Sequence, residues 1–133
     1  MQFSDAAVNG ALDAIETAIG ASPVLRIRTG AAPANCAAAR TGTVLATLNL
    51  PADFMASASA RAKALAGTWQ DLSADAAGTA AHFEIMNNAL SACHIQGTVT
   101  ATGGGGHMTL DNTNIAAAQQ VTITSFTISG PAA

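Results

Sequence analysis

The stretch Ala92–Leu110, ACHIQGTVTATGGGGHMTL, has the clearest two-residue alternation in the chain and contains its own turn. From residue 93 to residue 101, apolar or small side chains alternate with His, Gln and Thr. Successive side chains of a strand point to opposite faces, so this alternation is the pattern of a half-buried strand. The glycines at 103–106 favour a turn, and the residues after them resume the alternation. The stretch therefore predicts a β-hairpin at the centre of an antiparallel fold.

The predicted hairpin has one register in which both strands agree. With a four-residue loop at Thr102–Gly105, small or apolar residues face each other: Ala101 with Gly106, Val99 with Met108, and Gly97 with Leu110. In the same register His107 lies opposite Thr100, and His94 is several pairs further along the ladder. The histidines therefore do not converge, and we expect no metal site among His82, His94, His107, the two cysteines and Asp111.

The N-terminal residues have the pattern of a capped amphipathic helix. Ser4 is a favourable N-cap, Phe3 precedes it as a hydrophobic staple, and Gly20 is a favourable stop. Between them one apolar stripe recurs at helical spacing: Val8, Leu12, Ile15 and Ile19. We therefore expect a helix at about residues 4–19. Its opposite face carries Asp13 and Glu16, which we interpret as solvated carboxylates and not as a catalytic pair.

The remaining segments predict a mainly β fold. Besides the hairpin, the runs with strand character are Val24–Thr29, Thr43–Leu50, Ala62–Leu72, Ala80–Met86 and Val121–Ser129. We expect a single domain over residues 1–133. It would be an antiparallel β-sandwich or small barrel of about seven strands, at about residues 23–129, with one N-terminal α-helix.

Two of these runs carry finer predictions. In Ala80–Met86, Phe83 and Ile85 are expected to face inward, and His82 and Glu84 outward. In the last run the apolar phase switches near Ser125, which predicts a bulge or twist at that point.

The composition limits the partners. Charged residues make up 10% of the chain, and five Lys and Arg against eight Asp and Glu give a net charge of -3. This balance provides no basic footprint, so we expect no nucleic-acid partner. No apolar run approaches the length of a membrane span, so we expect no membrane partner. Aromatic residues are only 4%, so packing depends on few large side chains and we expect help from neighbouring subunits.

The sequence contains no arrangement of residues that predicts an enzyme. No Lys-Ser or Lys-Thr pair follows the glycine run, so we interpret Gly103–Gly106 as a hairpin tip and not as a phosphate loop. Cys93 and His94 are neighbours on a strand and point to opposite faces, unlike a nucleophile and its base. Cys36 and Cys93 are interpreted as unpaired thiols, with a disulfide as the alternative. We expect no catalytic residue, no cofactor and no metal.

Three segments are candidates for contacts between subunits. The loop Thr29–Gly42 is long and poor in bulky residues, so contact with a partner chain is one physical explanation for such a loop. The hairpin tip and the edges of the last strand, or of Val24–Thr29, could pair across subunits. The candidate interface residues are Thr29, Pro33, Asn35, Arg40, Gly104, Gly105, Val121, Ile123 and Phe126.

The stretch CHIQGTVTATGGGGHMTLDNTNI, residues 93–115, resembles a family of small virion structural proteins of tailed bacteriophages and prophages. The resemblance extends to the capped N-terminal helix and covers nearly the whole chain. The matching segments, in the same order, are SPVLRIRTGAAPA at 22–34, TGTVLATLNLP at 41–51, AGTAAHFEI at 77–85 and VTITSFTIS at 121–129. The resemblance supplies no catalytic or ligand residues.

What the resemblance implies is a non-enzymatic part of the virion, made in the cytoplasm of the host bacterium. It would be a head decoration, collar, connector or tail component that contacts copies of itself and other virion proteins. The alternative is a receptor- or carbohydrate-binding module of a phage fibre, in which Trp69 or His82 touches the ligand. We interpret Trp69, the only tryptophan, as a core or interface anchor. A regulator or secreted factor outside the virion is a further alternative.

Overall fold

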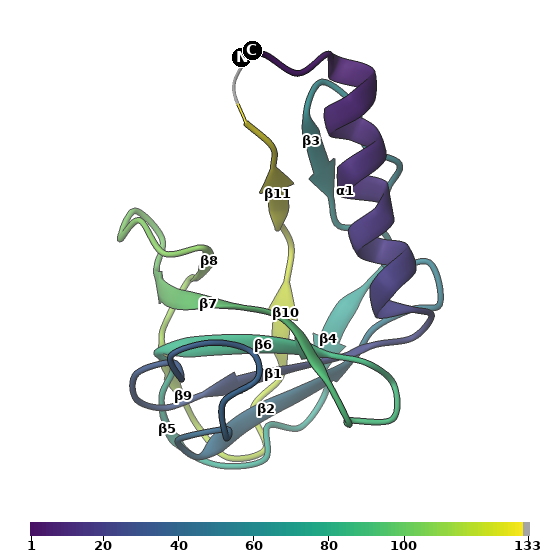
Figure 1. Ribbon diagram of the computed structural model, residues 1–133. Helices are drawn as coiled ribbons and strands as arrows, with labels where there is room; N and C mark the ends of the chain where they lie inside the picture. Colours follow the sequence, from purple (N-terminus) through teal and green to yellow (C-terminus); the bar gives the residue numbers. More distant parts are fainter. Residues whose placement is uncertain (132–133) are drawn as a thin grey trace.

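The computed structural model describes residues 1–131 (Figure 1). Strands contain 36% of the residues and helix 11%, which confirms the mainly β class with one N-terminal helix. The elements are α1 (Asp5–Ile19), β1 (Val24–Arg28), β2 (Val44–Asn49), β3 (Ala62–Ala64), β4 (Trp69–Asp71), β5 (Gly78–Thr79), β6 (His82–Met86), β7 (Cys93–Ala101), β8 (Met108–Leu110), β9 (Asn114–Ile115), β10 (Val121–Ile123) and β11 (Thr127–Ser129). A five-stranded sheet of order β2-β1-β6-β7-β8 and three two-stranded pairs together form a half-barrel.

The described residues form eleven strands and not the seven expected, because two of the predicted runs are divided and two short strands, β5 and β9, lie outside the predicted runs. Ala62–Leu72 contains β3 and β4, and Val121–Ser129 contains β10 and β11. β10 pairs with β4, whereas β11 pairs with β3. The phase switch near Ser125 therefore marks the point where the chain leaves one strand pair for the next.

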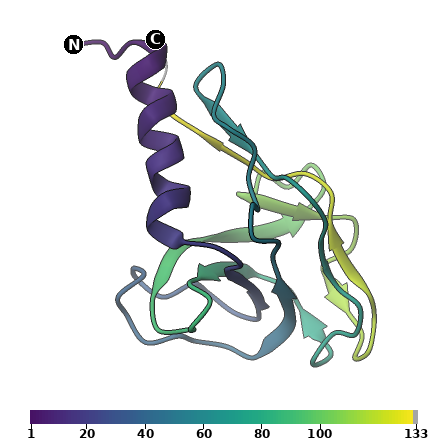
Figure 2. The same ribbon diagram turned by 90° about the vertical axis from the view of Figure 1, so that its right-hand side faces the viewer.

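Helix α1 begins and ends where the sequence indicates. The Ser4 hydroxyl accepts a hydrogen bond from the Ala7 N–H at 3.2 Å, and Gly20, with φ of +85°, follows the last turn. The helix buries Val8, Leu12 and Ile19. It extends away from the half-barrel beside β3 and β11 (Figure 1, Figure 2).

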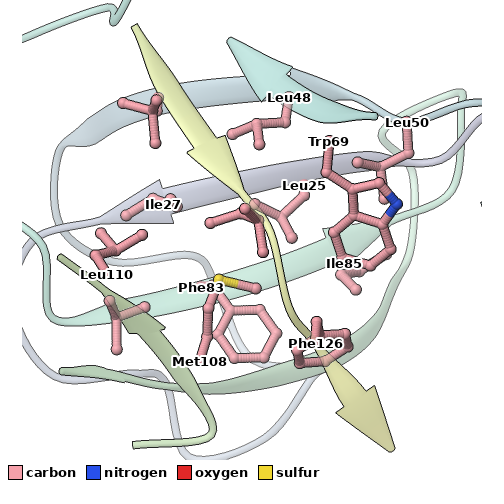
Figure 3. Close-up of a cluster of buried hydrophobic side chains, with 14 of the residues drawn as sticks. Leu25, Ile27, Leu48, Leu50, Trp69, Phe83, Ile85, Met108, Leu110 and Phe126 are labelled. Atoms are coloured by element: carbon pink, nitrogen blue, oxygen red, sulfur yellow. The ribbon is translucent and has the colours of Figure 1, made fainter. Parts of the chain in front are cut away.

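One face of the five-stranded sheet carries the hydrophobic core (Figure 3). Trp69 of β4 lies in this core, and its ring centroid is 5.5 Å from that of Phe126. Phe126 in turn packs edge-on against Phe83 of β6. Phe83 and Ile85 therefore face inward as predicted, and Trp69 is a core anchor.

Strand β1 lies inside the sheet and not at its edge. Leu25 pairs with Leu48 of β2 on one side and with Ile85 of β6 on the other. Both edges of Val24–Arg28 are therefore occupied by the chain itself. The expectation that this strand could pair across subunits was wrong.

Strand β8 pairs with β7 in the parallel direction, which contradicts the predicted hairpin. Val99 faces Met108 as expected, but Leu110 faces Ala101 and not Gly97. Parallel pairing of strands joined by a short loop requires the chain to reverse direction twice. Either direction pairs apolar residues with one another, so the alternation could not distinguish them.

The glycine run makes the double reversal possible. φ is +86° at Gly103 and +80° at Gly105, a region that other residues rarely adopt. Gly106 passes so close to Thr100 that an added Cβ would lie 2.9 Å from the Thr100 backbone nitrogen. The Gly106 N–H donates to Thr100 Oγ1 at 3.0 Å, so the loop is held against the strand that precedes it.

Arg61, next to β3, ties the N-terminal segment to the segment after β11. Its Nη1 donates to the Phe3 carbonyl at 3.0 Å and to the Asp5 carboxylate at 2.6 Å. Its Nε donates to the Pro131 carbonyl at 2.7 Å. The helix and the last strand are therefore fixed to the same point on the chain.

Two glycine substitutions test the helix and the loop with opposite expected signs. Gly10→Ala should raise the free energy of unfolding by about 0.5–1 kcal/mol, because glycine weakens a helix and nothing lies within 4 Å of an added Cβ. Gly106→Ala should lower it by about 1–3 kcal/mol, because the added Cβ meets Thr100. Urea unfolding of both variants measures this. A Gly106→Ala protein as stable as wild type would contradict the path of the loop.

Candidate functional site

The loop between β1 and β2, residues 29–43, covers the outer face of the five-stranded sheet; we call it the outer-face loop. Side chains of the sheet bond to its carbonyls: Arg28 Nη1 to Gly42 at 3.2 Å, His82 Nδ1 to Gly30 at 2.7 Å, and Gln96 Nε2 to Pro33 at 2.7 Å. The loop is thus bound by the chain's own sheet. The composition of the loop suggested contact with a partner chain, and it did not suggest this contact with the chain's own sheet.

A buried carboxylate anchors the outer-face loop. Glu84 of β6 accepts hydrogen bonds from Arg28 Nε at 2.8 Å and from Arg40 Nη1 at 3.2 Å. Arg40, which belongs to the loop, also donates to Gln96 Oε1 at 3.1 Å. A buried charge is tolerated when it is paired and hydrogen-bonded. The loop therefore supplies one of the two guanidinium groups that pair with the buried Glu84 carboxylate.

The two rings that the fibre hypothesis assigns to a ligand are both buried. His82 is 1% exposed and Trp69 is 0% exposed, and Trp69 Nε1 donates to the Phe54 carbonyl at 3.1 Å. His82 and Glu84 point away from the core as expected, but the outer-face loop covers them, so both are buried. Neither ring is available to stack on a ligand.

The histidines and acids do not gather into a metal site. Within residues 1–131, no group of three or more His, Cys, Asp and Glu lies close enough together to hold a metal ion. His107 contacts Thr98 and not Thr100 as expected, because the loop reverses twice; the Thr98 N–H donates to His107 Nδ1 at 3.1 Å. In the same described part of the chain, no helix has the length and apolarity needed to span a membrane.

Asp13 and Glu16 remain 47% and 21% exposed, but both bind a buried lysine that their interpretation as solvated carboxylates did not include. Lys63 of β3 is 1% exposed, and its Nζ lies 2.7 Å from Asp13 Oδ1 and 2.6 Å from Glu16 Oε2. The hydrogen bond from Lys63, with a second from the Ala58 N–H, lowers the pKa of Asp13. Burial by itself lowers the pKa of Lys63, but the hydrogen bonds to both carboxylates outweigh it and the pKa is raised. The lysine is therefore held as a cation and is no nucleophile.

Cys36 and Cys93 are free thiols, as interpreted from the sequence. They line one cavity of about 510 Å³ together with Arg40, Met86 and Ser91. Burial, and then the neighbouring Cys36 thiol, raises the pKa of Cys93 to about 12. At neutral pH the Cys93 thiol is therefore protonated and weakly nucleophilic.

The nine candidate interface residues lie in different environments. Val121, Ile123 and Phe126 are buried in the core, so their side chains are not offered to a partner. Pro33 is buried and the Arg40 side chain points inward, both within the outer-face loop. The positions at the surface are Asn35, Gly104 and Gly105, with Thr29 partly exposed. No large apolar side chain of this set is therefore exposed.

One apolar surface open to solvent is a groove between α1 and β11, which we call the helix groove. It encloses about 520 Å³ and includes Phe3, Ala7, Ala11, Ile15, Ile128 and Pro131. Phe3 is 49% exposed, and none of the described residues that line the groove has a titratable side chain. The signal for it was present in the sequence: residues 3, 7, 11 and 15 form a second apolar row at helical spacing.

The half-barrel is open between β7 and β11. Among the described strands, β11 pairs only with β3, and the first part of β7 pairs only with β6. A cavity of about 380 Å³ lies between them, lined by Phe83, Ile95, Phe126 and Ile128 among others. Each of these two strands therefore keeps one edge without a strand partner.

No protein-family model matches the chain, and neither the search of curated proteins nor that of solved structures found a match. Function must therefore be inferred from the residues themselves.

The Lys63 pairs predict how stability depends on pH. The lowered pKa of Asp13 stabilises the fold above its ordinary value of 3.8, and this is lost as the pH falls. The raised pKa of Lys63 stabilises the fold below its ordinary value of 10.5, and this is lost as the pH rises. Relative to Lys63→Met, wild type should therefore lose stability at both extremes. Urea unfolding from acidic to alkaline pH measures the free energy of unfolding of both proteins.

Gln120→Ala, at an exposed position away from α1 and β3, provides the control and should keep the wild-type profile at both extremes. Parallel profiles for wild type and Lys63→Met would contradict the assignment of the titrating pair.

Proposed function

We propose that this chain is a non-enzymatic structural subunit of a tailed-bacteriophage virion, acting through contacts among symmetric copies of itself. It would serve as a head decoration, collar, connector or tail component. The observation that carries the proposal is the helix groove, an apolar surface formed by residues Phe3 to Ile15 and by β11. Its proposed occupant is the same groove on a second copy.

The helix groove has a shape that suits self-association. Phe3 projects at one end, while the small side chains of Ala7 and Ala11 leave a depression along the same helix face. In a twofold contact, Phe3 of each copy would fill the depression of the other, because a twofold interface uses the same patch on both subunits. Of the four phenylalanines and one tryptophan, Phe3 alone is exposed.

The charge distribution also supports association between copies. Four of the five cationic side chains, all except Arg26, form ion pairs within the chain. Few charges are left to repel a second copy or to require desolvation when surfaces meet. The unpaired edges of β7 and β11 offer further backbone hydrogen bonds to a neighbouring subunit.

The fibre-module alternative has less support. It assigned ligand contact to Trp69 or His82, and both rings are buried. The virion assignment itself comes from the resemblance of residues 93–115 and the segments around them to phage structural proteins.

Two variants on α1 test the occupant of the helix groove. Ala11→Glu places a carboxylate in the groove, where a second copy would have to bury it without a partner, so self-association should weaken about tenfold or more. Ala14→Glu, at an exposed position of the same helix outside the groove, should assemble like wild type. Sedimentation velocity over a concentration series measures both. A wild-type monomer at every concentration, or equal behaviour of the two variants, would refute the contact.

Mass spectrometry of gradient-purified particles tests the virion assignment separately. Particles released from a lysate of the encoding phage or prophage should contain this chain at a fixed ratio to the major shell protein. Hundreds of copies would indicate a shell decoration, and tens or fewer a collar or tail ring. Absence from intact particles would refute the assignment.

A further inference from the structure

Cys36 and Cys93 come from distant parts of the chain and meet at one place on the outer face of the sheet. Cys36 lies in the outer-face loop, and Cys93 is the first residue of β7. The two thiols line the same cavity, and the Cys36 thiol lies near enough to Cys93 to contribute to the raised pKa of Cys93. Both residues are partly exposed, so a reagent in solution has access to them.

The surrounding contacts bind the segment around Cys36 to β7. Gln96, three residues beyond Cys93, donates to the Pro33 carbonyl at 2.7 Å. Arg40 donates to the Cys36 carbonyl at 3.1 Å and to Gln96 Oε1 at 3.1 Å. The loop is therefore bound to β7 on both sides of Cys36, which keeps one thiol at a high effective concentration beside the other.

We propose that Cys36 and Cys93 are an oxidation site, at which a low-molecular-weight disulfide such as oxidised glutathione closes an intrachain disulfide between the outer-face loop and β7. The proposal stands on the placement of the two thiols and is independent of any assembly with other subunits. A disulfide has an S–S bond of about 2 Å, so closure requires the loop to bring Cys36 Sγ into direct contact with Cys93 Sγ.

The reaction has two exchange steps. The Cys36 thiolate attacks one sulfur of oxidised glutathione, the S–S bond of glutathione breaks, and one glutathione thiolate leaves. Cys93 then loses its proton to solvent and attacks the Cys36 sulfur, which releases the second glutathione. Two protein thiols are oxidised to one disulfide, and one glutathione disulfide is reduced to two glutathiones.

The second step sets the pH dependence. The groups that face the Cys93 thiol are the Cys36 thiol, the guanidinium of Arg40 and the carboxylate of Glu84. With its pKa raised to about 12, mainly by burial, Cys93 is a thiolate only rarely at neutral pH. Closure of the mixed disulfide should therefore accelerate about tenfold per pH unit between pH 7 and pH 9.

The test uses the full-length reduced protein incubated with oxidised glutathione under native conditions. Intact mass should fall by two hydrogens, and a non-reducing peptide map should show Cys36 joined to Cys93. The melting temperature should rise by roughly 5–15 °C, since the cross-link closes a long chain segment. Glutathione attached to both cysteines without a cross-link, a cross-link between two chains, or no reaction would overturn the proposal.

Three variants distinguish the effect of the placement of the two thiols from the reactivity of either thiol alone. Cys93→Ser should stop with one glutathione on Cys36. Gln96→Ala removes the bonds to Pro33 and Arg40 and should lower the equilibrium constant for the cross-link about tenfold. Gln120→Ala, at an exposed glutamine elsewhere, should leave it unchanged. If Gln96→Ala fails to fold, the wild-type peptide map still decides the proposal.

Discussion

The outer half of the molecule depends on the buried carboxylate of Glu84. Its strand, β6, lies inside the sheet, so the carboxylate cannot reach water at an edge. One guanidinium, that of Arg28, comes from the neighbouring strand, but the second, that of Arg40, has to come from the outer-face loop. The loop therefore folds back over the sheet, and its many small residues allow it to lie close to that face. A stretch that reads as an unstructured connection is fixed in place by this charge and by the hydrogen bonds that Arg28, His82 and Gln96 donate to its carbonyls.

Local patterns predicted those features that depend on neighbours in the sequence. The cap at Ser4, the stop at Gly20 and the inward pair Phe83 and Ile85 are all of this kind. Charges were mispredicted because their partners are remote: Arg40 is 44 residues from Glu84, and Lys63 is 50 residues from Asp13. No periodicity within a helix or strand contains that information. Alternation placed His82, Glu84, Asp13 and Glu16 on the polar face of their elements, but it could not show what covers that face.

The direction of β8 and the helix groove show a second limit. Val99 can face Met108 in either strand direction, and the contact of Gly106 with Thr100 accompanies the parallel path. In the same way, α1 has two apolar rows, and the sequence does not show which one the fold buries. Val8, Leu12 and Ile19 are covered, whereas the row that begins at Phe3 lines an open groove because β11 docks at its side. Patterns identify the apolar surface of an element, and the packing of remote segments decides how much of it stays exposed.

Buried ion pairs join remote segments at both ends of the molecule, and they reduce the charge left on the surface. Glu84 is buried under Arg28 and Arg40, and Lys63 is buried under Asp13 and Glu16, so a chain with few aromatic residues connects its segments through internal ion pairs. These pairs use most of its cations and leave an exterior with little charge. Contacts between such exteriors are weakly steered by electrostatics and depend on shape. The exposed ring of Phe3 beside two alanines then becomes the strongest candidate for a specific contact, because it combines apolar area with a matching depression on the same face.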